Sequence, residues 1–220
     1  MSVIISFSGT DGSGKSTQIR ILINELRKKG LRTKYIWARG GYTPLFSLLK
    51  KILRFILPKK FKYSDGKQLR EKVLKKNFVS KIWLFIATLD LLIFYGVYVR
   101  MISPFMDVII CDRYIEDTLI DFKRNFSNTF DDHSFLWKLL LFLAPRPNKS
   151  FLLHVPVVVS LARSKLKKEP FPDTPETLAF RLSEYLNDSI FPSQRYHKID
   201  CQISIESTNK EILEKLKELF

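Results

Sequence analysis

A glycine-rich stretch close to the N-terminus holds the residues whose types and spacing best suit chemistry. Residues 9–16 read Gly-Thr-Asp-Gly-Ser-Gly-Lys-Ser, which fits the pattern G-x-x-x-x-G-K-[ST]. Glycines in this pattern let backbone N–H groups turn inward around phosphate oxygens at the start of a helix. Lys15 would reach the β and γ phosphates of ATP, and Ser16 would offer its hydroxyl oxygen to Mg²⁺. The stretch therefore predicts a P-loop with ATP and Mg²⁺ as its ligands.

The segments on either side of this loop are those that a P-loop requires. Residues 3–7 form a short apolar run typical of a strand, and aliphatic residues recur at helical spacing from Ile19 until Gly30. The alternative is an accidental glycine turn, and the flanking strand and helix count against it. The residues of the loop expected to bind ATP are Gly9, Asp11, Gly12, Ser13, Gly14, Lys15, Ser16 and Thr17.

A second candidate, Asp112, follows an unbroken apolar run at residues 108–111. Such a run is typical of a central parallel strand, and ligands of α/β proteins bind at the carboxyl ends of these strands. We therefore expect Asp112 and Arg113 in the catalytic site, with Ser16 and Asp112 nearest to Mg²⁺. The alternative is a surface ion pair between Asp112 and Arg113.

The rest of the chain alternates between strand and helix patterns. An alternation of this kind implies a parallel sheet wrapped by helices on both faces. The pattern predicts an α/β fold with the three layers of P-loop NTPases, in one domain over residues 1–220. Further strands are expected at 33–38 and 150–155, and further helices at 82–99, 135–143, 158–168, 177–186 and 211–219.

The apolar run at 82–99 is long enough to raise the question of a membrane span. Asp90 lies near its middle, and a carboxylate there would cost about 2.5–3.5 kcal/mol on the insertion scale. We therefore expect a buried helix.

The charge of the chain is strongly basic and unevenly distributed. The net charge is +15, and residues 44–76 hold eleven Lys or Arg against two acidic residues. The spacing within 45–57 predicts a basic amphipathic helix, which could contact an anionic membrane or be an ordinary solvated face. No nucleic-acid-binding motif accompanies the charge. The two cysteines form no CxxC pair, and no secretory signal is recognisable, so a cytoplasmic protein is expected.

Three stretches together resemble the thymidylate kinase family. Residues 7–18, Phe-Ser-Gly-Thr-Asp-Gly-Ser-Gly-Lys-Ser-Thr-Gln, are similar to that family's loop F-E-G-x-D-G-S-G-K-S-T-Q. Asp112-Arg113-Tyr114 is similar to its D-R-Y/F signature, and residues 153–163 are similar to L-D-V-P…L-x-R at the entry to its lid. The resemblance implies nucleotide substrates and a homodimer.

The resemblance also implies roles for individual residues. Asp11 would meet a hydroxyl of the acceptor, Asp112 would act near Mg²⁺, and Arg113 would hold phosphate. Arg39 would contact the acceptor's phosphate, and Arg163 would stack on adenine. Phe85 is a candidate for stacking on a base, with core packing as the alternative. Because Gly12 stands where some members carry an arginine, lysines in a lid around 160–176 are expected to supply that charge, with a solvated basic helix end as the alternative: Lys165, Lys167 and Lys168.

Three positions depart from the family pattern in ways that affect the acceptor. Leu91 replaces an arginine, and Asp121 and Phe122 stand where the family has Tyr and a base-reading Gln. Three interpretations follow. The first is a kinase that phosphorylates dTMP or another nucleoside monophosphate, and the second is a related kinase with a saccharide or lipid-linked acceptor at a membrane. The third is a non-catalytic ATP-binding module with a basic face for nucleic acid or membrane.

Overall fold

The computed structural model describes residues 2–38, 40, 77–167 and 173–219. These residues form two compact units. The sheet unit comprises Met1–Trp37, Ile102–Ile120 and Arg146–Phe220, and the helical unit comprises Ala38–Met101 and Asp121–Pro145. The single domain over 1–220 stays a prediction, and the expected basic helix at 45–57 lies outside the described residues.

The sheet unit is built on a five-stranded sheet with the order β2-β3-β1-β4-β5. Every neighbouring pair of strands is parallel. The central strands are nearly continuous apolar runs, because helices cover both of their faces. The strands are β1 (Val3–Gly9), β2 (Thr33–Trp37), β3 (Val108–Asp112), β4 (Lys149–His154) and β5 (Tyr196–Asp200).

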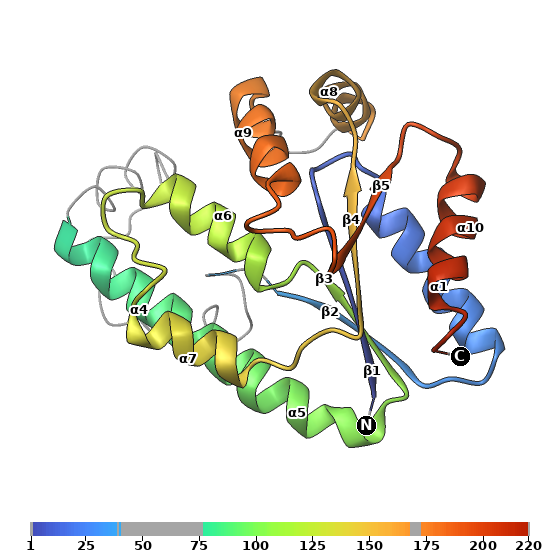
Figure 1. Ribbon diagram of the computed structural model, residues 1–220, viewed down its shortest axis with the longest axis horizontal. Helices are drawn as coiled ribbons and strands as arrows, with labels where there is room; N and C mark the ends of the chain where they lie inside the picture. Colours follow the sequence, from blue (N-terminus) through green and yellow to red (C-terminus); the bar gives the residue numbers. More distant parts are fainter. Residues whose placement is uncertain (1, 39, 41–76, 168–172, 220) are drawn as a thin grey trace, which may run out of the picture. The chain divides into compact units, whose positions relative to one another are not determined.

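Helices cover both faces of this sheet (Figure 1). On one face, α1 (Lys15–Lys28) and α10 (Ile205–Leu216) bury aliphatic side chains against β1, β3 and β4. On the other face, α6 (Ile115–Asn125) and α9 (Pro175–Leu186) contribute Ile120 and Tyr185 to a second cluster with Leu152 of β4. The expected three-layer α/β fold is confirmed.

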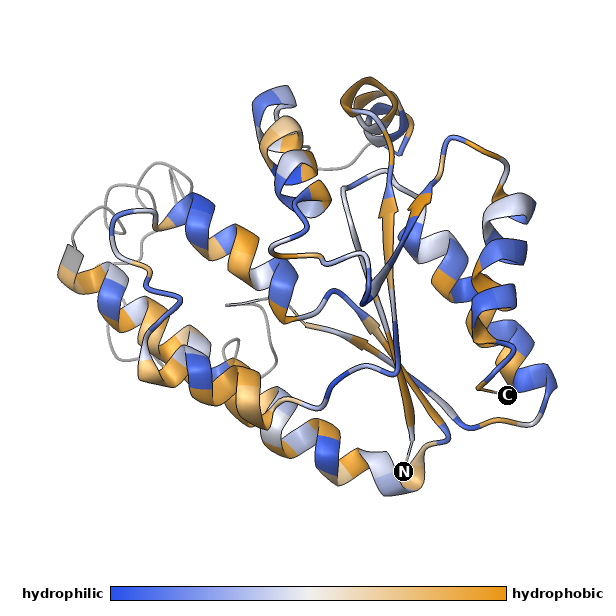
Figure 2. Ribbon diagram, viewed as in Figure 1, coloured by the Kyte–Doolittle hydropathy of each residue, from blue (hydrophilic) through white to orange (hydrophobic). Residues whose placement is uncertain are grey.

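The helical unit contains a long apolar helical run. It consists of α4 (Asn77–Ile93), a π-helical turn η2 (Phe94–Tyr98) and most of α5 (Val99–Ile102). The last residue of α5 and the 3₁₀ turn η3 (Ser103–Phe105) belong to the sheet unit. Helix α7 (Phe135–Leu143) packs along α4, and most residues of both helices are apolar (Figure 2). An aromatic cluster joins these helices to the second half of α6: Trp83, Phe122, Phe126, Phe130 and Trp137.

The expectation of a buried helix at 82–99 is met on one face only. Leu84, Ala87, Leu91 and Tyr95 are buried, whereas apolar residues on the other face are exposed. Within the described residues, Phe78–Phe105 is a helical run whose length and apolarity would suit a membrane span, and 39% of its most apolar window is buried. The exposed residues are Phe78, Ile82, Phe85, Leu89, Ile93, Val97, Tyr98, Met101 and Phe105.

Two elements of the sheet unit do not follow from the sequence patterns. Helix α6 begins with a polar first turn, and β5 is a short strand at the edge of the sheet with polar residues such as His197 and Lys198. The other predicted elements in the described residues are present, with ends that shift by a few residues. The largest shift is at the last helix, which begins at Ile205 rather than Glu211.

Candidate phosphate-binding site

The glycine-rich loop connects the end of β1 to the start of α1, as the sequence predicts. Gly9, the last residue of β1, has φ 137°, and a Cβ built there would lie 1.8 Å from the carbonyl oxygen of Leu153 on β4. No side chain fits in that space. Gly14 is the N-cap of α1 with φ 90°, so the first free backbone N–H groups of the helix follow directly after the loop. This arrangement favours a bound anion.

Lys15 is folded over the loop that precedes it. Its Nζ donates to the carbonyl oxygens of Gly9 at 2.8 Å and Thr10 at 2.7 Å, and the residue is 7% exposed. Burial is the largest cause that lowers the pKa of the Lys15 ammonium to about 8, and the nearby Arg113 charge lowers it further. The neighbouring aspartates, Asp11 first among them, raise the pKa and oppose part of this shift.

The lowered pKa predicts that nucleotide binding depends on pH. Phosphate oxygens favour the charged ammonium, so binding above pH about 8 must take up a proton at Lys15. The affinity for ADP should therefore be level below this pH and fall by up to about tenfold per pH unit above it. Calorimetric titration across this range measures the effect. The Lys15→Arg variant is the control, because its guanidinium stays charged and the decline should vanish.

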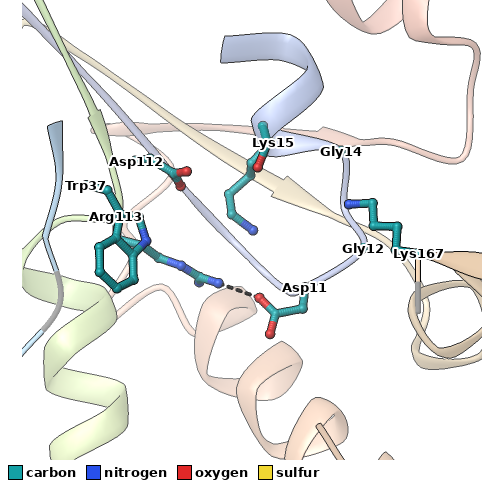
Figure 3. Close-up of a pocket in the computed structure, with 9 residues that line it drawn as sticks. Asp11, Gly12, Gly14, Lys15, Trp37, Asp112, Arg113 and Lys167 are labelled. Carbon is teal, nitrogen blue, oxygen red and sulfur yellow. Dashed lines mark hydrogen bonds and ion pairs between the residues drawn. The ribbon is translucent and has the colours of Figure 1, made fainter. Parts of the chain in front are cut away.

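The loop opens into a cavity of about 140 Å³ (Figure 3). Asp112, at the end of β3, and Lys15, at the start of α1, both line this cavity, although 97 residues separate them in the chain. Parallel strands place their carboxyl ends at one edge of the sheet, which brings the two together. The remaining lining residues are Asp11, Gly12, Gly14, Ser16, Trp37, Arg113 and Lys167.

Ser16 and Asp112 are suited to Mg²⁺. Both side chains offer oxygen ligands in the same cavity, and Mg²⁺ prefers oxygen and is usually held by one or two protein groups together with phosphate and water. Tyr35 Oη donates to Asp112 Oδ2 at 2.9 Å, which fixes the orientation of the carboxylate. No cluster of three or more acidic, His or Cys ligands occurs among the described residues. A metal here would therefore need the phosphates of a nucleotide.

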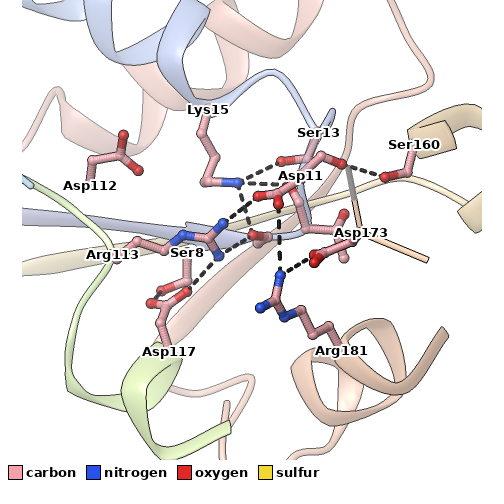
Figure 4. Close-up of polar contacts among 12 residues, drawn as sticks. Ser8, Asp11, Ser13, Lys15, Asp112, Arg113, Asp117, Ser160, Asp173 and Arg181 are labelled. Atoms are coloured by element: carbon pink, nitrogen blue, oxygen red, sulfur yellow. Dashed lines mark hydrogen bonds and ion pairs between the residues drawn. The ribbon is translucent and has the colours of Figure 1, made fainter. Parts of the chain in front are cut away.

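Arg113 joins the loop to the rest of the site (Figure 4). Its Nη1 donates to the carbonyl oxygen of Gly9 at 2.6 Å and to Asp117 Oδ1 at 3.0 Å, and its Nη2 donates to Asp11 Oδ1 at 2.7 Å. A hydrogen bond to Tyr185 Oη completes the set. Arg113 has φ 80°, a left-handed conformation that is uncommon outside glycine and occurs where surrounding contacts hold it. The alternative of an exposed Asp112–Arg113 ion pair does not describe this buried guanidinium.

Asp117 is the buried carboxylate that holds Arg113. Its side chain is 1% exposed and accepts hydrogen bonds from Ser8 Oγ at 2.6 Å and Tyr185 Oη at 2.6 Å. It also accepts from the backbone N–H of Tyr114 at 2.9 Å, so the acidic residue in the first turn of α6 reaches back to the start of the helix, as in a capping box. The sequence motifs did not identify Asp117 as a site residue, although it lies four residues after Arg113.

Helix α8 (Val157–Leu166) packs directly on the glycine-rich loop. Ser160 Oγ donates to the carbonyl oxygen of Asp11 at 2.5 Å, and Arg163 Nη1 donates to that of Gly12 at 3.2 Å. A Cβ at Gly12 would lie 2.9 Å from the Ser160 carbonyl oxygen. The position therefore has no room for an arginine side chain in this arrangement.

Similar proteins are found along almost the whole chain. The thymidylate kinase of Desulfotalea psychrophila is 27% identical over 99% of this chain and 95% of its own length. That of Sulfurihydrogenibium sp. is 24% identical over 99% of this chain and 98% of its own, and that of Symbiobacterium thermophilum is 46% identical over 24% of each. The chain is a distant relative of the thymidylate kinases. No family model matches it.

Of the further residues that the thymidylate kinase pattern suggested, Lys167 lines the cavity, and the others that the structure describes do not. Arg163 donates to the carbonyl oxygens of Gly12 and Cys201, and stacking on adenine stays a prediction. Lys165 is exposed and Lys167 lines the cavity, whereas Arg39 and Lys168 lie outside the described residues. Phe85 lies in the helical unit, is 58% exposed, and keeps an untested role.

The departures from thymidylate kinases at Leu91 and Phe122 have a physical reason. Both side chains are buried in the helical unit, and Phe122 packs against Trp83, Phe126 and Trp137 in the aromatic cluster. An arginine or a glutamine in these places would put a polar group into an apolar core, which is costly without a hydrogen-bond partner. The two positions therefore contribute to packing.

Proposed function

We propose that this protein is an ATP-dependent phosphotransferase that phosphorylates a nucleoside monophosphate, with dTMP as the first candidate. The observation that carries the proposal is that Lys15, Ser16 and Asp112 line one cavity at the start of α1. The relationship to thymidylate kinases over the whole chain supports kinase activity at the level of the family. A cytoplasmic location and a homodimer are part of the same proposal.

The residues of the loop would divide the work of phosphoryl transfer among them. The backbone N–H groups after Gly14 would hold phosphate oxygens, and Lys15 would leave its loop carbonyls to follow the γ-phosphoryl group. Ser16 and Asp112 would hold Mg²⁺, which when bound neutralises charge on the phosphates. An oxygen of the acceptor's phosphate would attack the γ phosphorus, the bond to the bridging oxygen would break, and ADP would leave.

Two positions where thymidylate kinases carry an arginine and a base-reading glutamine hold Leu91 and Phe122 in this chain. With Leu91 and Phe122 in the core, neither an arginine nor a base-reading glutamine is available at these positions. A site discriminates strongly between similar molecules only when the wrong one leaves a buried polar group unpaired. We therefore propose that selection among pyrimidine monophosphates is weak.

A panel of acceptors tests this proposal. ADP release, measured by a coupled assay, should be detectable with dTMP and differ by less than about tenfold between dTMP, dUMP and dCMP. Sugars and lipid-linked glycans belong in the same panel, because turnover of these and of no nucleotide would favour the second interpretation of the sequence. Turnover that is efficient and restricted to dTMP would contradict the weak selectivity.

Two lysines of the proposed lid offer a matched pair of variants. Both are exposed, but Lys167 lines the cavity and Lys165 does not. If Lys167 stabilises charge on the moving phosphoryl group, Lys167→Ala should lower kcat by about tenfold or more with a smaller change in KM for ATP. Lys165→Ala should leave both constants near those of the wild type. Equal effects of the two changes, or an effect on KM alone, would count against the role of Lys167.

A further inference from the structure

Arg181 of α9 is a buried arginine that reaches the glycine-rich loop from behind the cavity. Its side chain is 8% exposed and forms an ion pair with Asp173, the residue before the N-cap of α9. Its Nη1 also lies 3.7 Å from Asp11 Oδ2. Figure 4 shows the guanidinium between these two carboxylates. Arg181 thereby joins the segment that precedes α9 to the P-loop.

Asp11 is in turn shared between two arginines. Its Oδ1 accepts from Arg113 at 2.7 Å, and its Oδ2 faces Arg181. Arg113 lines the cavity and Arg181 does not. A carboxylate between two guanidinium groups binds each of them less strongly when the other approaches more closely. The distance between Arg181 and Asp11 therefore affects how firmly Asp11 holds Arg113.

A nucleotide would compete with Asp11 for Arg113, because phosphate oxygens entering the cavity are acceptors for the same donors. When Arg181 neutralises Asp11, Arg113 is easier to draw toward phosphate. When Asp173 draws Arg181 away, Asp11 keeps Arg113. The charges of Asp173 and Arg181 thus change how strongly Arg113 can bind phosphate, although neither residue lines the cavity.

We propose that Arg181 is a positioning residue that couples Asp173, just before the N-cap of α9, to the nucleotide affinity of the P-loop, through Asp11 and Arg113. The inference rests on the proposed function and adds a residue that adjusts the nucleotide affinity of the same site. It also gives α9 a defined part: the helix contributes Tyr185 to Arg113 and Arg181 to Asp11, one turn apart on one face.

The test is a double-mutant cycle on the dissociation constant of Mg²⁺–ADP, measured by calorimetry. Arg181→Met should weaken binding by about tenfold, because Asp11 then depends on Arg113 alone and the site loses one positive charge. Asp173→Asn should tighten binding several-fold, about threefold or more, because Arg181 is released to Asp11. In the Arg181→Met background, Asp173→Asn should have no effect. Arg181→Lys should fall between the wild type and Arg181→Met.

A second ion pair of the sheet unit serves as the control. Asp188 pairs with Lys198 at 2.5 Å and is not among the residues that line the cavity, so Asp188→Asn should leave ADP binding unchanged. An effect of Asp173→Asn that persists at full size without Arg181 would overturn the proposal, and so would equal effects of Asp173→Asn and Asp188→Asn. Failure of the wild type to bind Mg²⁺–ADP would instead overturn the proposed function and this inference with it. If Arg181→Met does not fold, Arg181→Lys replaces it in the double-mutant cycle. The effect of Asp173→Asn on ADP binding should then be smaller than in the wild type.

Discussion

Replacing Lys15 with methionine should lower ATP turnover by about 10²–10³-fold, the range seen when one preorganised donor to a developing charge is removed. The Lys15 ammonium lies at the start of α1, where it donates hydrogen bonds to the carbonyl oxygens of Gly9 and Thr10. Methionine fills a similar volume without the charge. The loss should appear in kcat, and KM for ATP should rise as well, because the charge also contributes to phosphate binding although backbone N–H groups still hold phosphate.

The fold of the Lys15→Met variant should remain intact. The side chain is buried, and burial already disfavours its charged form, as the lowered pKa of about 8 indicates. Removing the charge relieves that cost and offsets the loss of the two hydrogen bonds. Lys28→Met is the control on the same helix, because Lys28 is 72% exposed and pairs with Glu25 at the surface. Near-wild-type turnover in Lys15→Met would rule out the loop as the site of transfer.

Replacing Gly9 with alanine should destabilise the protein by more than about 4 kcal/mol, which places it among the most damaging single substitutions. The added Cβ would lie 1.8 Å from the Leu153 carbonyl oxygen, and both atoms belong to paired central strands that cannot move apart without breaking the sheet. The residue would also be held at φ 137°, a conformation that side chains other than glycine rarely adopt.

Substitution at Gly30 distinguishes the effect of the steric contact from the effect of the backbone conformation. It has φ 80°, and a Cβ there would meet no atom within 4 Å, so Gly30→Ala suffers from the backbone conformation alone. That strain costs about 1–2 kcal/mol. Urea denaturation of both variants, followed by circular dichroism, measures the difference. A Gly9→Ala protein as stable as Gly30→Ala would show that the contact between β1 and β4 is looser than described.

Features that depend on short stretches of sequence could be predicted. The G-x-x-x-x-G-K-[ST] pattern located the loop between β1 and α1, and the apolar run before Asp112 located a central strand, because each signal is contained within about ten residues. The alternation of strands and helices was sufficient for the layered fold. The resemblance to thymidylate kinases, noted on three motifs, is supported by relatives that span the chain.

Features that depend on packing between distant segments could not be predicted. Arg113 follows β3 and Tyr185 and Arg181 lie in α9, about 70 residues later, yet these side chains meet around the loop. Asp117 could have been predicted, since it lies four residues after Arg113 and has the spacing of a helical ion pair. The departures at Leu91 and Phe122 were visible in sequence, but only the core of the helical unit shows why apolar residues stand there.

The most direct test of the proposed phosphotransferase follows the γ-phosphoryl group itself. ATP labelled at the γ phosphate is incubated with Mg²⁺ and dTMP, and the products are separated for the wild type and for Lys15→Met. The proposal predicts that the label appears on dTDP with the wild type and falls by about 10²-fold or more with Lys15→Met. Binding of ATP without label on dTDP or on any other nucleoside diphosphate, or equal transfer by the two proteins, would contradict it.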